Sequence, residues 1–469
     1  METLQRTANR GSVSTKYDVD NSVKLDRLNA EKLQFTFDQA ATNLKKNTLS
    51  IWFKRNVIGV NQGLYQFGDD ASGEHTYIRF TSSADQGFLR GNFGSNVQFL
   101  LTTQSFRDTS AWYHLVVAWD TTQSTASDRL KVYLNGSEIT AFDTDNRSSV
   151  IPLNHDTPNG ENGKSVLIGE GVYKISSYIA ETHFVDGQAL APTEFGEFDS
   201  DSGIWKPKEY TGTYGNNGFY LDFKNSSNLG EDQSGNNHDF TLNNITAADQ
   251  STDTCTNNFC TLNPLVNFKY TTNEITEGAT EFGDDTGGGV GGAFGTFAVT
   301  KGKWYWEVKL TQQNSHYIGV SAVDDGDNVF ASTDPQDENS SFVFNIAVAR
   351  IEYVNSGTKS YGSADAFTDF HSAGDIIGIA LNMDDNQISI YGNGTLQSGV
   401  ANSSIYDAAN KMVVPFHGTI NDECQYNFGG YSAWTPASAA SDANGYGTFE
   451  YAPPSGYYAL CTKNLAEYG

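Results

Sequence analysis

Hydrophobic and polar residues alternate in short runs along most of the chain, and this pattern predicts β-strands. In the first half the runs are LQFTF (33–37), LSIWFKR (49–55), YIRFTS (77–82), AWYHLVVAW (111–119), LKVYLNG (130–136) and KSVLIGEG (164–171). Leu130, Val132 and Leu134 would lie on one face of a sheet, because side chains alternate sides along a strand. Lys131 and Tyr133 would lie on the other face. Short strands divided by turn residues predict a β-sandwich or barrel.

A second series of strand-like runs begins near Phe268. Its members are WYWEVKL (304–310), YIGVSAV (317–323), SFVFNIAV (341–348), MVVPFHG (412–418) and CQYNFGG (424–430). In WYWEVKL, Trp304, Trp306 and Val308 share one face, which is the alternation of a half-buried strand. The two series together predict two β-sandwiches in tandem.

Two distant stretches repeat one pattern, HLVVAWDTTQSTASDRLKVYLNG (114–136) and DIIGIALNMDDNQISIYGNG (375–394). Each has an apolar run, a polar turn that contains Asp, a second alternating run and then Asn-Gly. Asn-Gly suits a tight hairpin turn in which both central residues have positive φ. We therefore expect the same hairpin twice, at the middle of a sheet in each sandwich.

These signals divide the chain into four parts. Residues 1–20 are polar with little periodicity and predict an N-terminal arm. Residues 21–202 predict the first sandwich, 203–265 a loop-rich connector, and 266–469 the second sandwich with a C-terminal tail. LAPTEFGEF (190–198) predicts a short helical stretch, because Pro192 suits a helical first turn.

The first half resembles the laminin-G-like branch of the concanavalin-A-like lectin fold. SIWFKR, WYHLVVAWD, LKVYLNG and YIAETHFVDGQALAPTEF occur in that family's order. The second half resembles a SPRY domain through GKWYWEVKL, YIGVSA, GDIIGIALNMDDNQISIYGNG and YNFGG. Both families belong to the concanavalin-A-like class, so the resemblance implies an all-β protein of two tandem jelly-roll sandwiches.

The pairing of these domains resembles virion proteins of marine tailed phages. The segments that carry this likeness are LQRTANRGSVSTKYDVDNSVKL, FRDTSAWYHLVVAWDTTQ, FGEFDSDSGIWKP and DQSTDTCTNNFCTLNPL. It implies a tail or capsid fibre or adhesin, located in the virion, that recognises a host-surface glycan or protein and contacts other virion proteins. The arm would then be the virion anchor. Two alternatives are a polysaccharide-degrading tailspike and a non-viral SPRY protein-interaction module.

Single sites of a lectin-like sandwich should bind weakly, because sugar hydroxyls lose water on binding. Many linked copies would compensate. We therefore expect a homo-oligomer, a trimer in the simplest case, although no coiled-coil heptads enforce that number.

The charge of the chain excludes some partners. Acidic residues number 56 against 29 basic ones, for a net charge of −27, and such a surface repels phosphate backbones. We expect no nucleic acid. No apolar run approaches a membrane span, and the N-terminus has no apolar core of a secretory signal. We expect no membrane insertion and no export by that route.

Catalysis would need groups that the sequence does not bring together. Glycosidases of this fold use paired carboxylates, and EFDSD places Glu197, Asp199 and Asp201 at alternate positions. That stretch lies in a connection, without an apolar strand to raise the pKa of an acid. Neither a G-x-S-x-G elbow nor an H-E-x-x-H motif occurs. We expect no enzyme and no catalytic residues.

Candidate ligand contacts lie in two loops, which contain Asp69, Asp70 and His75 in the first half and Asp324, Asp325, Asp327 and Asn328 in the second. Laminin-G-like domains often bind calcium at the rim, so Asp69 and Asp70 are candidate Ca²⁺ ligands. An Asp-rich turn is the alternative, and we favour it. Apart from this Ca²⁺ we expect no cofactor.

The four cysteines, Cys255, Cys260, Cys424 and Cys461, are too few for a disulfide scaffold in a chain of 469 residues. The pair in CTNNFC could bridge a small loop, or could hold part of a metal site, although no second Cys or His pair lies nearby in the sequence. We favour reduced thiols.

Overall fold

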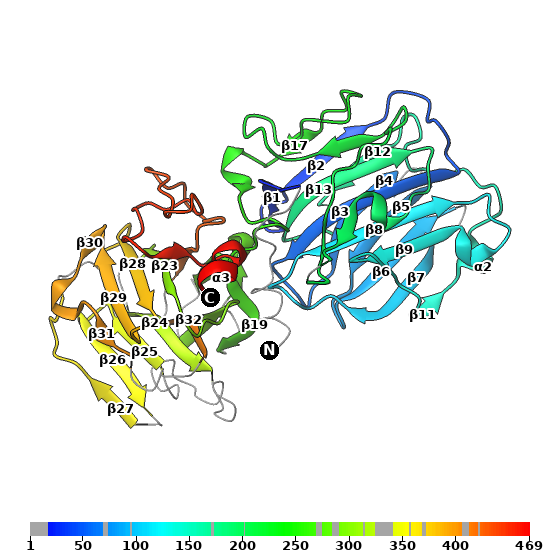
Figure 1. Ribbon diagram of the computed structural model, residues 1–469. Helices are drawn as coiled ribbons and strands as arrows, with labels where there is room; N and C mark the ends of the chain where they lie inside the picture. The colour runs from blue at the N-terminus through cyan, green and yellow to red at the C-terminus, as the bar shows by residue number, and fades with distance from the viewer. Residues whose placement is uncertain are drawn as a thin grey trace. The chain divides into compact units, whose positions relative to one another are not determined.

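The computed structural model describes residues 17–68, 74–93, 96–169, 173–200, 202–268, 274–283, 290–312, 315–323, 341–355, 358–367, 372–405, 412–420 and 423–469. The chain forms two compact units, Ser14–Thr256 and Asn257–Gly469. Each is a sandwich of β-sheets (Figure 1), so the all-β fold with two tandem jelly rolls is confirmed. None of the described helices is long and apolar enough to cross a membrane.

The first unit, blue to green in Figure 1, packs two sheets face to face. One sheet contains, in spatial order, β10 (Ser137–Glu138), β9 (Leu130–Leu134), β8 (Tyr113–Asp120), β3 (Lys46–Arg55), β13 (Ser177–Asp186), β1 (Ser22–Leu25) and β18 (Gln250–Ser251), with β16 (Phe219–Leu221) beside β13. The other contains β11 (Phe142–Asp145), β7 (Asn96–Ser105), β6 (Gln86–Asn92), β5 (His75–Phe80), β4 (Gln62–Gly68), β12 (Ser165–Ile168), β2 (Lys32–Thr36) and β17 (Thr241–Asn243).

The core of the first unit lies between these sheets. Phe53 of one sheet and Phe80 of the other have ring centroids 5.4 Å apart, and Phe67 and Phe184 have centroids 4.7 Å apart. In β9, Leu130, Val132 and Leu134 are buried in this core, whereas Lys131 and Tyr133 are partly exposed. The predicted alternation of β9 is confirmed.

Short elements connect the strands of the first unit. They are η1 (Ala126–Asp128), α2 (Arg147–Val150), η2 (Pro192–Glu194), η3 (Ala247–Asp249) and a small two-stranded sheet of β14 (Gly196–Phe198) and β15 (Trp205–Pro207). The helical stretch expected at 190–198 is only the single 3-10 turn η2, with Pro192 at its start. The turn ends because β14 begins at Gly196 and pairs with β15.

The segment expected to be a connector continues the first unit instead. Its residues 205–251 supply β15, β16, β17 and β18. Asp253 then accepts hydrogen bonds from Trp112 Nε1 at 3.0 Å and from Lys54 Nζ at 2.8 Å, all three side chains being buried. These strands have only two or three residues each, which is too short for an alternating pattern to show in the sequence.

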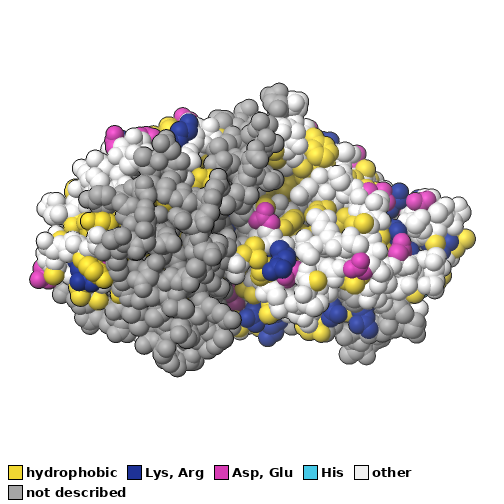
Figure 2. Space-filling view, turned by 90° about the horizontal axis from the view of Figure 1, so that it is seen from below, with side chains coloured by type: hydrophobic (Ala, Val, Ile, Leu, Met, Phe, Trp, Pro, Cys, Tyr) yellow, Lys and Arg dark blue, Asp and Glu magenta, His cyan; other side chains and the backbone are white. Residues whose placement is uncertain are grey.

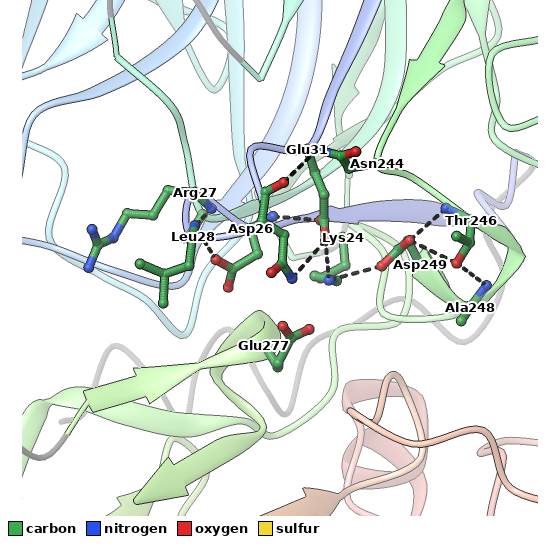
Figure 3. Close-up of polar contacts among 12 residues, drawn as sticks. Lys24, Asp26, Arg27, Leu28, Glu31, Asn244, Thr246, Ala248, Asp249 and Glu277 are labelled. Atoms are coloured by element: carbon green, nitrogen blue, oxygen red, sulfur yellow. Dashed lines mark hydrogen bonds and ion pairs between the residues drawn. The ribbon is translucent and has the colours of Figure 1, made fainter. Parts of the chain in front are cut away.

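Lys24 of β1 is buried between two carboxylates of the first unit (Figure 3). Its Nζ lies 3.1 Å from Glu31 Oε1 and 2.9 Å from Asp249 Oδ1. Glu31 Oε2 also accepts the backbone N–H of Asp26 at 2.7 Å. Burial raises the pKa of Glu31 to about 7, while Lys24 opposes that rise. The cluster ties β1 to the start of β2 and to η3.

The second unit, green to red in Figure 1, also has two sheets. One contains β19 (Leu262–Phe268), β22 (Val290–Gly295), β32 (Met412–Ile420), β24 (Ser315–Val323), β25 (Ser341–Asn345), β26 (Arg350–Asn355) and β27 (Thr358–Tyr361). The other contains β20 (Glu274–Thr276), β21 (Glu281–Gly283), β33 (Cys424–Asn427), β23 (Lys303–Leu310), β28 (Ile376–Asn382), β29 (Gln387–Gly392) and β30 (Thr395–Leu396), with β31 (Ser403–Ser404) beside β29 and β34 (Tyr458–Ala459) beside β23. Its helical elements are η4 (Glu277–Ala279), η6 (Ser398–Val400) and α3 (Thr462–Tyr468).

Strand β23 is buried on both faces, not half-buried as its alternation predicts. Trp304 and Trp306 lie in the core between the sheets. On the opposite face, Tyr305 and Glu307 are buried because the C-terminal segment covers them, and Phe449 belongs to the same apolar cluster as Tyr305. The Glu307 side chain also holds that segment in place through hydrogen bonds.

The Glu307 carboxylate anchors the C-terminal segment to β23. It accepts the backbone N–H groups of Glu450 and Tyr451, each at 2.8 Å, the Tyr305 hydroxyl at 3.2 Å and Asn427 Nδ2 at 3.2 Å. Burial raises the pKa of Glu307 to about 7, although these hydrogen bonds favour the charged form.

The repeated sequence pattern forms the same hairpin in both units, β8–β9 and β28–β29. Asn135 Oδ1 accepts the backbone N–H of His114 at 2.8 Å, and Asn393 Oδ1 accepts that of Ile376 at 2.9 Å. Both asparagines have positive φ, as their turns require. Each hairpin lies toward one edge of its sheet, however, and not in the middle. On the sheet path, only the short strand that follows the Asn-Gly turn, β10 or β30, lies beyond it.

On the face drawn in Figure 2, hydrophobic side chains of the described residues appear in small groups among polar surface. Lys and Arg side chains are dispersed over the same face as Asp and Glu side chains. This view shows no single acidic face among the described residues, although the whole chain carries a net charge of −27.

Candidate functional site

Most of the ligand contacts expected from the sequence lie outside the described residues, namely Asp69, Asp70, Asp324, Asp325, Asp327 and Asn328. Calcium binding at the first loop therefore stays a prediction. His75 is described, and it is fully buried. It is the first residue of β5, held between β4 and β6, and its ring stacks on Tyr77 at 5.7 Å. It does not lie on an exposed loop, because the strand begins earlier than the sequence pattern indicates.

The acidic stretch EFDSD lies at the β14–β15 hairpin. Glu197 and Asp199 both face Lys206, whose Nζ is 3.5 Å and 3.2 Å from their carboxylate oxygens. Asp201 lies outside the described residues. The two carboxylates thus share one lysine as their ion-pair partner.

The hairpin rests on a histidine that the sequence did not single out. Trp205 Nε1 donates to Nδ1 of His114 at 2.9 Å, and Nε2 of His114 lies 2.8 Å from Ser50 Oγ. The His114 ring also stacks on Trp52 at 4.6 Å. Residues of three strands, β3, β8 and β15, are thus in contact at one buried imidazole.

These contacts decide where the His114 proton lies. An indole N–H can only donate, so Nδ1 must be the unprotonated nitrogen. Burial lowers the pKa of His114 to about 3, with a further contribution from His183, so the ring is neutral. Its single proton is therefore on Nε2 and is donated to Ser50 Oγ. His114 cannot take a proton from Ser50, and the pair is not a nucleophile with its base.

Glycines allow the indole of Trp205 to lie this close to the sheet. A Cβ at Gly136, in the Asn-Gly turn of the first hairpin, would lie 2.4 Å from the Trp205 ring. A Cβ at Gly196 of β14 would also lie 2.4 Å from it. The indole is thus packed between a turn and a strand, and only glycine leaves room at either position.

Phe198 presents an aromatic ring above this buried layer. It is 54% exposed, and its ring meets Trp205 edge-on at a centroid distance of 4.8 Å. Glu197, Asp199 and Lys206 come from the same two strands or directly follow them. The hairpin therefore combines an exposed aromatic ring, fixed from below, with hydrogen-bonding groups of both charges.

A second polar cluster on the same sheet is closed to solvent. Glu181 of β13 has φ of +43° at a bulge and is buried. Its carboxylate accepts the hydroxyls of Tyr17 at 2.7 Å and Tyr220 at 2.9 Å, and lies 3.4 Å from His183 Nε2. His183 Nδ1 is 2.9 Å from the Tyr214 hydroxyl. With all these partners in place, the carboxylate acts as a structural anchor. In the sequence, only the placing of Glu181 and His183 at alternate positions of the apolar stretch YIAETHFVD could have indicated this polar cluster.

Two family models match separate parts of the chain. Residues 29–170 match the model described as the concanavalin A-like lectin/glucanases superfamily, and residues 303–431 match the SPRY domain model. The chain contains a concanavalin A-like domain and a SPRY domain. His114 lies within the concanavalin A-like match, whereas Trp205 and Phe198 follow it. The likeness to phage virion proteins stays a prediction.

Solved structures of low identity resemble parts of the chain. The SPRY domain of human HERC1 is 17% identical, with a TM-score of 0.25 over 35% of this chain and 96% of that chain. A heptameric SAP-like pentraxin from Limulus polyphemus is 16% identical, with a TM-score of 0.26 over 37% and 80%. Domains LG4-5 of the mouse laminin alpha1 chain are 8% identical, with a TM-score of 0.28 over 87% and 88%. No curated protein matches the sequence.

Proposed function

We propose that the protein binds rather than catalyses, and that its concanavalin A-like domain recognises a glycan at the β14–β15 hairpin. The observation that carries this proposal is the exposed ring of Phe198 held on the buried Trp205. A sugar stacks its C–H face on an aromatic ring while its hydroxyl groups bond to polar side chains. Lys206 and its two carboxylate partners belong to the same hairpin, where Glu197 and Lys206 form the strand pair next to that of Phe198 and Trp205 and point to its other face.

The arrangement of the ionisable groups supports a role without catalysis. Ser50 and His114 are fully buried, and the proton on Nε2 prevents His114 from acting as a base toward Ser50. Glu197 and Asp199 are paired with one lysine, and Glu181 is closed off by two tyrosines. Each acid of the described hairpin and bulge thus has a structural partner.

We propose further that the protein is part of a bacteriophage virion, as a tail or capsid fibre or adhesin. The segment FGEFDSDSGIWKP, which carries part of the likeness to phage proteins, is the β14–β15 hairpin itself. In this proposal the SPRY domain binds protein, either another virion protein or a host receptor. Single-site affinity is weak, and a homo-oligomer on the particle, a trimer, raises avidity by roughly 10²–10⁴-fold.

Glycan binding can be tested with Phe198→Ala and a matched control in the same domain. Leu153 is 51% exposed, so Leu153→Ala removes a similarly exposed hydrophobic side chain away from the hairpin. Purified full-length variants are titrated with host-surface polysaccharide by calorimetry. We expect Phe198→Ala to weaken binding about 5-fold or more, since stacking on an aromatic ring contributes about 1 kcal/mol or more. Leu153→Ala should bind as the wild type does.

Three results would count against the proposal. Equal binding by Phe198→Ala and wild type would remove the hairpin as the site. New reducing ends in the polysaccharide would make the protein an enzyme. Absence of its density from a reconstruction of the phage particle would remove the virion assignment and favour a non-viral SPRY interaction module.

A further inference from the structure

Three metal-ligating side chains meet inside the SPRY sandwich. His316 of β24, His417 of β32 and Cys424 of β33 each offer one donor atom, and these atoms lie within 4.8 Å of one another. All three side chains are fully buried. Strands β24 and β32 are neighbours in one sheet, whereas β33 belongs to the other. The three groups therefore meet between the two sheets of the sandwich.

We propose that His316, His417 and Cys424 form a zinc-binding site that links the two sheets of the SPRY domain. Two imidazoles and a thiolate are ligands that Zn²⁺ prefers in proteins. The site is independent of the glycan proposal, because it lies in the other unit and uses none of the hairpin residues.

The distances between Cys424 and His417 fit a metal site after a side-chain rotation. Zn–S bonds of about 2.3 Å and Zn–N bonds of about 2.0–2.1 Å, at a tetrahedral angle, place sulfur and nitrogen about 3.6 Å apart. Cys424 Sγ lies 3.4 Å from Nε2 and 3.6 Å from Nδ1 of His417. Because sulfur is nearly equidistant from both nitrogens, it lies over the ring face. Loading requires the Cys424 side chain to turn toward the lone pair of Nε2.

The surroundings of His417 already hold the ring in place for such a ligand. The hydroxyl of Tyr426 lies 3.0 Å from Nδ1. When it accepts the Nδ1 proton, the lone pair is on Nε2, the nitrogen closer to Cys424. Metal-ligating histidines commonly have such a partner on the second nitrogen, which fixes both tautomer and ring orientation. Phe282 packs edge-on against the same ring at a centroid distance of 5.5 Å.

Charge balance points to a fourth group. Zn²⁺ with one thiolate would leave a positive charge in an apolar core, which is unfavourable. Cys260 is buried in the same core cluster as Cys424 and Tyr426. A second thiolate from Cys260 would make the site neutral. The CTNNFC motif would then contribute one ligand, and the rest would come from strands far along the chain.

The test uses full-length protein that has been stripped with a chelator and then titrated with Zn²⁺ against a chromophoric competitor. Cobalt(II) replaces zinc in a parallel sample, because a thiolate ligand gives a charge-transfer band in the near ultraviolet. Cys461 is the matched control, since it is another fully buried thiol of the same unit and is absent from the cluster. We expect one tightly bound Zn²⁺ per chain and a higher melting temperature in wild type and in Cys461→Ser.

Variants at the cluster should behave differently from the control. Cys424→Ser should lose stoichiometric zinc binding and much of the intensity of the cobalt band, since only the Cys260 thiolate would remain, and Cys260→Ser should weaken binding. Tyr426→Phe keeps the ligands and should bind about 10–100-fold more weakly. No stoichiometric binding by wild type, a cobalt band of unchanged intensity in Cys424→Ser, or binding of Cu⁺ without Zn²⁺ would each overturn the proposal. Because the wild-type titration and Tyr426→Phe do not depend on the folding of Cys424→Ser, the test remains decisive if that variant fails to fold.

Discussion

Trp205 and His114 are 91 positions apart in the sequence, yet the indole N–H of one donates to the imidazole Nδ1 of the other at 2.9 Å. This single contact joins the β14–β15 hairpin to strand β8 and fixes the tautomer of the histidine. It also determines how firmly the aromatic layer below Phe198 is held.

The first prediction removes that donor. In Trp205→Phe the ring packing is partly kept, but the buried Nδ1 of His114 loses its hydrogen bond. We expect the first unit to lose about 1–3 kcal/mol of unfolding free energy, measured by urea denaturation. Trp434→Phe is the control, because the Trp434 indole N–H makes no hydrogen bond within the described residues. An unchanged midpoint for Trp205→Phe would show that the contact is not formed.

The second prediction separates steric clash from backbone strain at a hairpin turn. Gly136 and Gly163 have φ of +81° and +78°, so Ala at either is strained by about 1–2 kcal/mol. Only at Gly136 would the new Cβ also meet the Trp205 ring, whereas nothing lies within 4 Å at Gly163. Gly136→Ala should therefore lower the unfolding free energy by about 1–3 kcal/mol more than Gly163→Ala does. Equal melting temperatures for the two variants would contradict the packing of Trp205 on this turn.

The third prediction compares a buried with a partly exposed lysine. Lys24→Met leaves the buried carboxylates of Glu31 and Asp249 without their cation, and should cost about 3–5 kcal/mol. Lys45→Met removes an exposed ion pair to Asp156, 2.7 Å long, and should cost about 1 kcal/mol or less. Chemical denaturation of both variants gives the comparison. Similar losses would mean that Lys24 is more hydrated than its burial indicates.

The fourth prediction concerns pH. Burial raises the pKa of Glu307 to about 7, above the ordinary value of 4.5, so the folded state binds this proton more tightly than the unfolded state does. Its contribution to stability is fully present below about pH 4.5 and is lost as pH rises through about 7. The lowered pKa values of the buried His316 and His417 act in the opposite direction on the SPRY unit, so the test is a comparison with wild type. Relative to wild type, the melting temperature of Glu307→Gln should rise as pH increases from about 4.5 to about 7. Glu31 has the same direction of shift in the first unit, so part of the whole-protein slope should remain. A slope unaffected by Glu307→Gln would contradict this assignment.

Strand positions could be predicted because burial imposes a local two-residue period, as in β9. The candidate site at the β14–β15 hairpin could not be predicted, because its contacts join residues that are far apart in the sequence and share no local pattern. Trp205 stands in a stretch whose Pro and Gly residues suggest a connection, and its role depends on His114 in a distant strand. The zinc cluster likewise combines His316 with residues about one hundred positions later. The burial of β23 on both faces depends on a covering segment that the strand itself does not encode.

Each sandwich joins an early part of its own sequence to a late part. Ser22 of β1 pairs with Ser251 of β18 in the first unit, and in the second Phe259 forms a bridge with Cys461. During synthesis on the ribosome, neither unit can complete its sheets until these last residues have emerged, so folding of each is delayed rather than progressive. The second pair begins along the chain only after the first pair is complete. The first sandwich can therefore form before the second has begun, and the chain avoids exposing two incomplete sheets at once.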